Sequence, residues 1–101
     1  MTTLADLRTK IDDVDQRIIA LLSERAGYVR EVGQHKKSDS DIVASDRQQQ
    51  VYLTRRQWAE AAGLDPDFVE RLYRMMIAHF IELQRQQLQS NESSPAPTAE
   101  R

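Results

Sequence analysis

The side chains best suited to chemistry in this sequence are three arginines, one lysine and one glutamine: Arg8, Arg25, Arg47, Lys36 and Gln84. A guanidinium group grips a carboxylate through two parallel hydrogen bonds, and an ammonium group stabilises negative charge that develops on an oxygen. Together these residues suit a small ligand with two carboxylates. The sequence offers no nucleophile beside a base, no paired carboxylates and no phosphate-binding glycine loop.

Arg25 is the most informative of these residues because it interrupts an apolar seam. The other members of the seam recur at alternating spacings of three and four: Leu4, Leu7, Ile11, Val14, Ile18, Leu21, Tyr28 and Val32. Lys36 lies eleven residues after Arg25 in what we expect to be one helix, and about 100° per residue places the two cations within roughly 20° of each other. Because a buried cation is costly unless it is paired, we expect a negatively charged partner on this face.

Arg8 precedes Arg25 by seventeen residues, which is about 25 Å along a helix and roughly 100° around it. The two arginines therefore cannot bind one small molecule within a single chain. In an antiparallel dimer, Arg8 of one copy can reach the site of the other. Gln84 is predicted to point inward because it follows Phe80 by four residues.

Each candidate also has an interpretation that involves no ligand. Arg8 and Arg47 fit solvated positions on a helix surface, and Arg25 fits an interhelical ion pair. Lys36 can complement a helix dipole, and Gln84 can be the polar edge of a fraying helix. Taken separately, these residues do not establish an enzyme.

Three helices are predicted to position these side chains. In chain order we expect a helix from Thr3 to about Lys37, a loop from Ser38 to about Ala44, a helix from Ser45 to about Ala62, and a helix from Pro66 to about Gln89. No strand pattern competes with them, so the predicted fold class is all-α. Residues 1–89 form one helical domain, and residues 90–101, with two prolines among small polar residues, form a disordered tail.

Short sequence signals mark the starts of two of these helices. Thr3 with Asp6, and Ser45 with Gln48, match the capping-box pattern that begins a helix. On that basis Gln48 fits a cap, but it directly follows Arg47, and we place it with Arg8, Arg25 and Arg47 among the candidate substrate-binding residues.

The second helix also has a predicted stripe and a predicted end. Val51 and Trp58 lie seven residues apart, so we expect them on one stripe of its surface. Gly63 is predicted to end the helix in a left-handed conformation.

The predicted helix lengths indicate a dimer. The first helix spans roughly 50 Å, whereas the other two span about 25 and 35 Å and cannot cover it unless they lie end to end. A second copy of the long helix covers the seam, so we expect an intertwined homodimer.

Composition excludes several classes of function. The net charge of −2 argues against nucleic acid as a partner, because phosphate binding needs a basic surface. There is no cysteine, and His35 and His79 are the only imidazoles, so we expect no metal site. The sequence has no signal-peptide pattern and no long apolar run. We therefore expect a cytoplasmic protein that does not span a membrane.

Seven stretches carry a resemblance to a known family: Leu4-Ala5-Asp6-Leu7-Arg8, Ile11-Asp12-Asp13-Val14-Asp15, Leu21-Leu22-Ser23-Glu24-Arg25, Lys36, Asp46-Arg47, Gly63-Leu64-Asp65 and Gln84. In order and spacing they resemble the all-helical, AroQ-type chorismate mutase family from about Leu4 to Gln84. The resemblance implies an intertwined dimer with composite sites. It also implies that Arg8 and Arg25 hold the two carboxylates of chorismate, while Lys36 and Gln84 contact the ether oxygen and Arg47 assists binding.

Within this family the chain is especially similar to the isochorismate pyruvate lyases of salicylate and pyochelin biosynthesis. The likeness is clearest at Tyr28-Val29, Lys36-Lys37-Ser38, Trp58-Ala59-Glu60 and Gly63-Leu64-Asp65. The chain departs from the mutase pattern at Ala44, where mutases carry an aspartate, and at Gln48, where they carry a glutamate; both acids bind the ring hydroxyl. Phe80 also replaces a small polar residue.

The resemblance implies a pericyclic enzyme without a cofactor that converts chorismate to prephenate. The same pocket is expected to permit conversion of isochorismate to salicylate and pyruvate. One alternative is a dedicated isochorismate pyruvate lyase that retains mutase activity. An alternative of another class is a non-catalytic helical dimer that acts as a scaffold.

Overall fold

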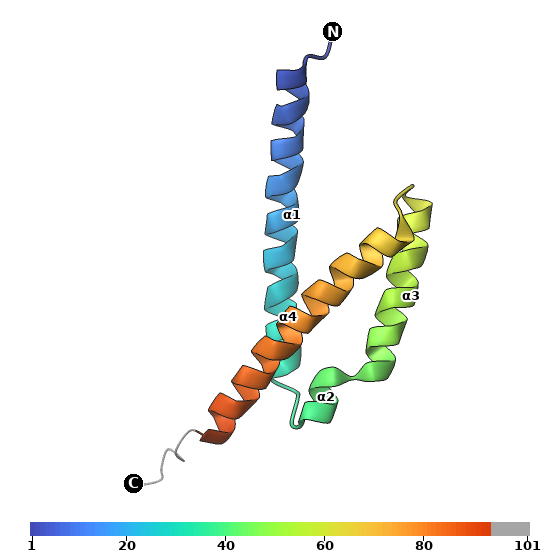
Figure 1. Ribbon diagram of the computed structural model, residues 1–101. Helices are drawn as coiled ribbons and strands as arrows, with labels where there is room; N and C mark the ends of the chain where they lie inside the picture. The colour runs from blue at the N-terminus through green and yellow to red at the C-terminus, as the bar shows by residue number, and fades with distance from the viewer. Residues whose placement is uncertain (94–101) are drawn as a thin grey trace. The chain divides into compact units, whose positions relative to one another are not determined.

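The computed structural model describes residues 1–93, and within them every regular element is helical. The helices are α1 (Leu4–Gly33), α2 (Asp39–Val43), α3 (Ser45–Ala61) and α4 (Pro66–Ser93), as Figure 1 shows. The all-α prediction is therefore confirmed. The three predicted helices are present, and a fourth, of five residues, occupies part of the segment predicted as a loop.

The chain divides into two compact units, of which the first is Met1–Val32 and the second begins at Gly33. The first unit is nearly all α1, whose start follows the predicted capping box. The backbone N–H of Thr3 donates to Asp6 Oδ2, and the N–H of Asp6 donates to Thr3 Oγ1, both at 3.1 Å. These bonds with Thr3 lower the pKa of Asp6.

The apolar seam of α1 is exposed along its whole length in this single chain. None of the residues of α1 is buried, and the exposed large side chains include Leu4, Leu7, Ile11, Val14, Ile18, Leu21, Tyr28 and Val32. A monomer rarely leaves so long an apolar stripe in water. α1 by itself therefore does not bury the seam that the sequence predicts.

α1 ends at Gly33, earlier than the predicted end near Lys37. The backbone N–H of Lys36 bonds to the carbonyl of Gly33 at 3.1 Å, which closes a turn after the helix. The predicted alignment of Lys36 with Arg25 on one helix surface is therefore wrong, because the helical geometry does not extend to Lys36.

The second unit is a helical hairpin of α3 and α4 with α2 packed against α4 (Figure 1). Its buried apolar side chains are Ile42, Val51, Tyr52 and Ala59. Ile42 comes from α2 and the other three from α3.

Trp58 departs from the predicted stripe of α3. Val51 is buried as expected, but the Trp58 indole is 59% exposed. The Arg55 guanidinium lies over the Trp58 ring, 4.5 Å from its centroid, and so covers one face of it at the surface.

The ends of α3 partly follow the predicted signals. Gly63 has φ +77°, and the N–H groups of Gly63 and Leu64 bond to the carbonyls of Glu60 and Ala59. This is the left-handed helix stop that the sequence predicts.

The start of α3 differs from the prediction. The cap is Ala44 (φ 42°, ψ 59°), which has no side-chain acceptor, and Ser45 is the first helical residue. The predicted capping box of Ser45 and Gln48 is therefore wrong.

α4 is longer than predicted. Asp65 Oδ1 accepts a hydrogen bond from the N–H of Asp67 at 3.0 Å, which caps the helix behind Pro66. The helix then continues to Ser93 and not only to about Gln89. Its 28 residues span about 42 Å, and the 30 of α1 span about 45 Å. The length difference used to infer a dimer is therefore small, while the exposed seam remains. The rest of the predicted tail, residues 94–101, lies outside the described residues.

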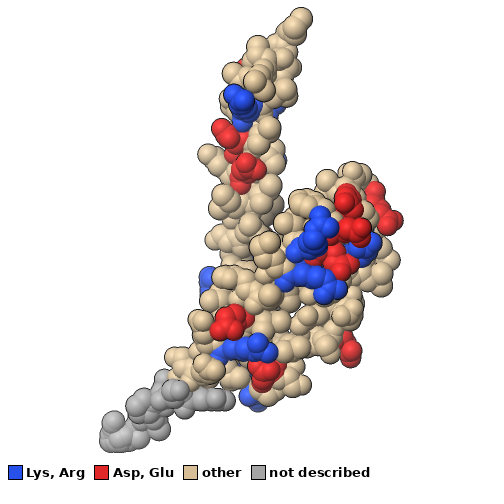
Figure 2. All heavy atoms as spheres, in the orientation of Figure 1, with Lys and Arg blue, Asp and Glu red and all other residues tan. Residues whose placement is uncertain are grey.

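Ion pairs connect α3 to the first half of α4. Arg56 Nη1 bonds to Asp67 Oδ1 at 2.9 Å and to Glu70 Oε1 at 3.0 Å, and Arg74 Nε bonds to Glu70 Oε2 at 2.7 Å. Figure 2 shows basic and acidic side chains gathered on this surface of the hairpin. The hydrogen bonds from Arg74 and then Arg56 lower the pKa of Glu70.

Candidate active site

In the second unit, two of the predicted site residues, Lys36 and Gln84, lie next to Gly33. Its carbonyl accepts the Lys36 N–H, so Lys36 lies in the turn that follows Gly33. A Cβ at Gly33 would lie 3.3 Å from Gln84 Cγ and 2.8 Å from Gln87 Oε1. Glycine therefore lets α4 approach this backbone closely at Gln84. Lys36 and Gln84, the two residues expected to contact the ether oxygen, thus both adjoin Gly33.

The Lys36 side chain is half-buried and anchored on α2. Its Nζ donates a hydrogen bond of 2.7 Å to the backbone carbonyl of Asp41. The Asp41 carboxylate accepts the N–H of Lys37 at 3.1 Å, and the N–H of Asp41 donates to Ser38 Oγ at 3.2 Å. An ammonium group has three N–H donors. The bond to Asp41 therefore orients Lys36 and leaves donors for a ligand.

Gln84 is buried, with 9% of its surface exposed, as its spacing from Phe80 predicts. Among the described residues it is the one polar residue that is buried. A buried amide is stable only when its polar atoms have partners. A glutamine can donate to an ether oxygen at any pH near neutrality because it needs no protonation.

Gln48 is half-buried and bonds to residues close to it in the chain. Its Nε2 donates to the carbonyl of Val43 at 2.5 Å, and Tyr52 donates its hydroxyl to Gln48 Oε1 at 3.4 Å. The amide thus connects the end of α2 to the first turns of α3. The Gln48 side chain therefore does not act as a helix cap, because its amide bonds to the carbonyl before Ala44.

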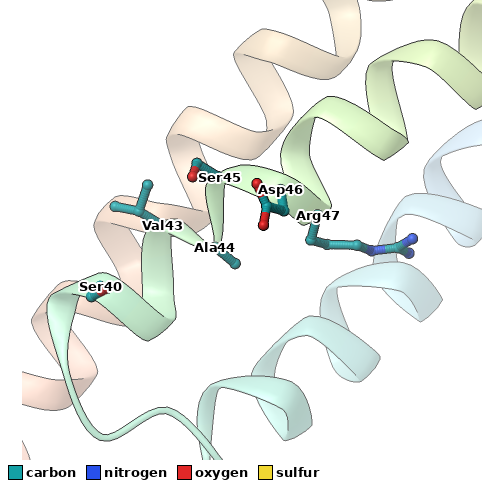
Figure 3. A pocket seen from close by; sticks show the side chains of 6 residues that line it. All are labelled: Ser40, Val43, Ala44, Ser45, Asp46 and Arg47. Carbon is teal, nitrogen blue, oxygen red and sulfur yellow. The ribbon is translucent and has the colours of Figure 1, made fainter.

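Arg47 is exposed at the start of α3, and its Nη1 donates to Gln50 Oε1 at 2.8 Å. It lines an open depression together with five neighbours: Ser40, Val43, Ala44, Ser45 and Asp46. In Figure 3 the Arg47 side chain extends away from the other labelled residues, with its guanidinium at the far end. The lining of this depression includes none of the other predicted site residues.

Arg8 and Arg25 lie on α1, in the first unit. Arg8 is exposed and Arg25 is half-buried. The helix between them is continuous, so they are separated by about 25 Å along the axis. The predicted separation of Arg8 and Arg25 along one helix is therefore confirmed.

Comparison with known proteins decides the family. Residues 7–85 match the family described as Chorismate mutase type II. The chain belongs to this family. The matched range contains Arg8 and Arg25 of α1, the α2 segment and Gln84. The chain is therefore an enzyme of the chorismate mutase type, as the sequence resemblance predicts.

Individual relatives show the same likeness. An isochorismate pyruvate lyase from Pseudomonas aeruginosa is 39% identical over 80 residues, which are 79% of this chain and 79% of the lyase. A chorismate mutase from Methanocaldococcus jannaschii is 26% identical over 91 residues, which are 89% of this chain and 92% of the mutase. A T-protein from Enterobacter agglomerans is 36% identical over 75 residues, but they cover only 20% of its length.

Sequence reasoning missed three residues around the Lys36 anchor. Arg85 and Asp39 form a two-bond ion pair between α4 and α2, and Asp41 supplies the carbonyl that holds Lys36. A signal for α2 was present, because Ser38 and Asp41 have capping-box spacing. No local pattern identifies Arg85, whose partner lies 46 residues away in the chain.

No described helix is long and apolar enough to cross a membrane.

Proposed function

We propose that this enzyme catalyses two pericyclic reactions at one site and prefers isochorismate to chorismate. Chorismate is rearranged to prephenate, and isochorismate is converted to salicylate and pyruvate. The observation that carries the preference is the chemistry at positions 44 and 48. Ala44 offers only a methyl group, and the Gln48 amide is already bonded to Val43 and Tyr52. Neither residue offers a carboxylate to the ring hydroxyl of chorismate.

The substrate is bound by cations from two copies of the chain. Arg25 of one copy and Arg8 of the other bind the two carboxylates through paired N–H donors. Arg47 is long and exposed, so its guanidinium can join the clamp when substrate is present. This binding holds the enolpyruvyl arm over the ring, which converts a flexible molecule into the reactive conformer.

Lys36 and Gln84 act where charge develops. As the ether bond breaks, negative charge grows on its oxygen, and the Lys36 ammonium stabilises it. Gln84 donates a second hydrogen bond from its buried position. In the rearrangement, a carbon–carbon bond forms as the carbon–oxygen bond breaks, and the ether oxygen becomes the ketone of prephenate.

In the lyase reaction, the same carbon–oxygen bond breaks while a hydrogen moves from the ring to the methylene carbon of the enolpyruvyl group. The ether oxygen becomes the ketone of pyruvate, and the ring becomes the aromatic ring of salicylate. All atoms of isochorismate are accounted for in the two products, so the step needs no oxidant, base or cofactor. The apolar Phe80 agrees with the preference for isochorismate, because it replaces a small polar residue of the mutase pattern.

In the proposed homodimer, each copy supplies its Arg8 to the site of the other copy. A second α1 buries the exposed seam of the first by antiparallel packing, so the seam is self-complementary. The same packing carries Arg8 along the partner helix toward Arg25. Thus one interface both covers the apolar side chains and completes two sites.

The decisive experiment incubates the purified protein separately with chorismate and with isochorismate and identifies the products by chromatography. Release of salicylate and pyruvate from isochorismate, together with slower formation of prephenate from chorismate, is the expected result. If chorismate is turned over efficiently and isochorismate is left unchanged, the lyase activity is refuted. If neither is changed, the enzyme acts on another substrate.

A dedicated lyase with residual mutase activity is the second candidate. The specific observation in its favour is the 39% identity to an isochorismate pyruvate lyase over most of both chains. The ratio of kcat/KM for the two substrates distinguishes the candidates, because a dedicated lyase turns over chorismate only as a side reaction.

A further inference from the structure

An ion pair ties the segment between Gly33 and α3 to α4. Arg85 Nε lies 2.6 Å from Asp39 Oδ1, and Arg85 Nη2 lies 3.2 Å from Asp39 Oδ2. Two parallel bonds of this kind fix the orientation of both groups as well as their distance. We propose that this ion pair is a latch that positions the Lys36 ammonium for catalysis, an inference that rests on the function proposed above.

The latch acts through α2. A helix of five residues is too short to be stable by itself, because helix nucleation is unfavourable. α2 is kept in place by the buried Ile42 side chain, by the Ser38 cap and by the bond between Asp39 and Arg85. If Asp39 is released, α2 loses its ion pair with α4 and keeps the buried Ile42 side chain, the Ser38 cap and the bond from Gln48 to the Val43 carbonyl.

Lys36 follows α2 because its side chain is bonded to it. The acceptor of Nζ is the carbonyl of Asp41, two residues beyond Asp39 on the same short helix. The next residue, Lys37, is tied by its N–H to the Asp41 carboxylate. A shift of α2 therefore moves both the carbonyl that orients the ammonium and the backbone beside Lys36.

Arg85 also sets the distance between the two proposed donors to the ether oxygen. Gln84 and Arg85 are consecutive on α4, so the latch joins the backbone that carries Gln84 to the helix that anchors Lys36. The Gln84 side chain is buried, whereas the Arg85 side chain is 42% exposed. Arg85 is thus a positioning residue and makes no contact with substrate.

The test compares kcat and KM for Arg85→Ala with those of wild type on isochorismate and chorismate. An exposed ion pair changes a local equilibrium by about twofold to fivefold, and we expect kcat to fall by that factor. KM should change little, because the Lys36 ammonium is needed mainly at the developing charge. Arg85→Glu, which faces Asp39 with a like charge, should lower kcat further, by roughly tenfold.

Charge reversal gives the discriminating readout. The double variant Asp39→Arg with Arg85→Glu restores an opposite-charge pair, so kcat should recover most of the loss seen with Arg85→Glu alone. Arg56→Ala is the matched control, because Arg56 joins α3 to Asp67 and Glu70 at the other end of α4. It should leave kcat unchanged. An equal fall in kcat for Arg56→Ala, or no recovery in the double variant, would overturn the latch.

Amide hydrogen exchange tests the latch without relying on the reaction. Exchange of the N–H groups of Lys37, Asp41 and Ile42, which bond within this segment, should accelerate in Arg85→Ala and remain unchanged in Arg56→Ala. If wild type turns over neither substrate, the proposed function has failed and exchange alone decides the latch. Unaltered exchange in Arg85→Ala would refute it in either case.

Discussion

Substrate preference can be switched by restoring the two acids that the mutase pattern has at positions 44 and 48. The variant is Ala44→Asp with Gln48→Glu, which places two carboxylates where a ring hydroxyl of chorismate can donate. One good hydrogen bond in a buried site is worth about 1–3 kcal/mol. We therefore expect the ratio of kcat/KM for chorismate over isochorismate to rise about tenfold to a hundredfold.

The two substitutions have different consequences for stability. Ala44 is left-handed, at φ 42° and ψ 59°, a conformation that aspartate tolerates better than alanine does. Ala44→Asp should therefore be neutral or slightly stabilising. Gln48→Glu removes the N–H donor to the Val43 carbonyl and places a carboxylate oxygen at the 2.5 Å contact. We expect this to lower the free energy of unfolding by about 1–3 kcal/mol.

Urea unfolding at several pH values separates this penalty from the change in specificity. In the Gln48→Glu variant, a protonated carboxyl at position 48 donates to Val43 as the amide does, so the folded-state pKa of the new carboxyl is raised. The penalty is present above that pKa and disappears as the pH falls below the unfolded value of about 4.3. Ala44→Gly is the control for position 44, because it relieves the left-handed strain without adding a carboxylate.

The assay measures kcat/KM for both substrates with wild type, each single variant, the double variant and Ala44→Gly. Ala44→Gly should raise stability and leave the ratio of the two substrates unchanged. If the double variant is folded and its ratio equals that of wild type, positions 44 and 48 do not recognise the ring hydroxyl. The argument for isochorismate preference would then be refuted.

Three further predictions concern the charged residues. Lys36→Ala should lower kcat by a factor of about 10²–10³ with a smaller change in KM, which steady-state kinetics measures. A large rise in KM at constant kcat would mean that Lys36 only binds substrate. Mixing inactive Arg8→Ala and Arg25→Ala chains should restore activity in heterodimers with one intact site, and no recovery after verified subunit exchange would contradict the composite site. The pKa of Glu70 is lowered because Arg74 and then Arg56 bond to its carboxylate. The contribution of Glu70 to the free energy of unfolding is therefore present above the unfolded pKa and is lost as the pH falls through the folded pKa. In urea unfolding, the midpoint of wild type should fall more steeply with acid than the midpoint of Glu70→Gln.

The sequence alone determined the three long helices, several of their ends and the separation of Arg8 from Arg25 on α1. The start of α1 at Thr3 and Asp6 depends on hydrogen bonds within a few residues, and so does the end of α3 at Gly63. A local sequence pattern was therefore sufficient to predict both. An uninterrupted helix has a constant rise per residue. The distance between Arg8 and Arg25 therefore followed from counting residues.

Only the tertiary structure decided how the second unit arranges the candidate site residues. The close approach of Gly33 to Gln84, and the ion pair of Arg85 with Asp39, join residues that lie far apart in the chain. No periodic pattern within a helix encodes such contacts. The anchor of Lys36 is a backbone carbonyl, which every residue possesses, so residue types could not identify it.

The inner face of α3 was likewise decided by packing against α4. Hydrophobicity alone favoured Trp58 inside, but the small Ala59 side chain is buried and lets the helices approach closely. Tyr52 is also buried, with the Arg74 guanidinium over its ring at 4.1 Å. Trp58 stays outside, where the Arg55 guanidinium covers one face of its ring. A cation supplied by a neighbouring turn thus replaced the burial that the hydrophobic pattern predicted.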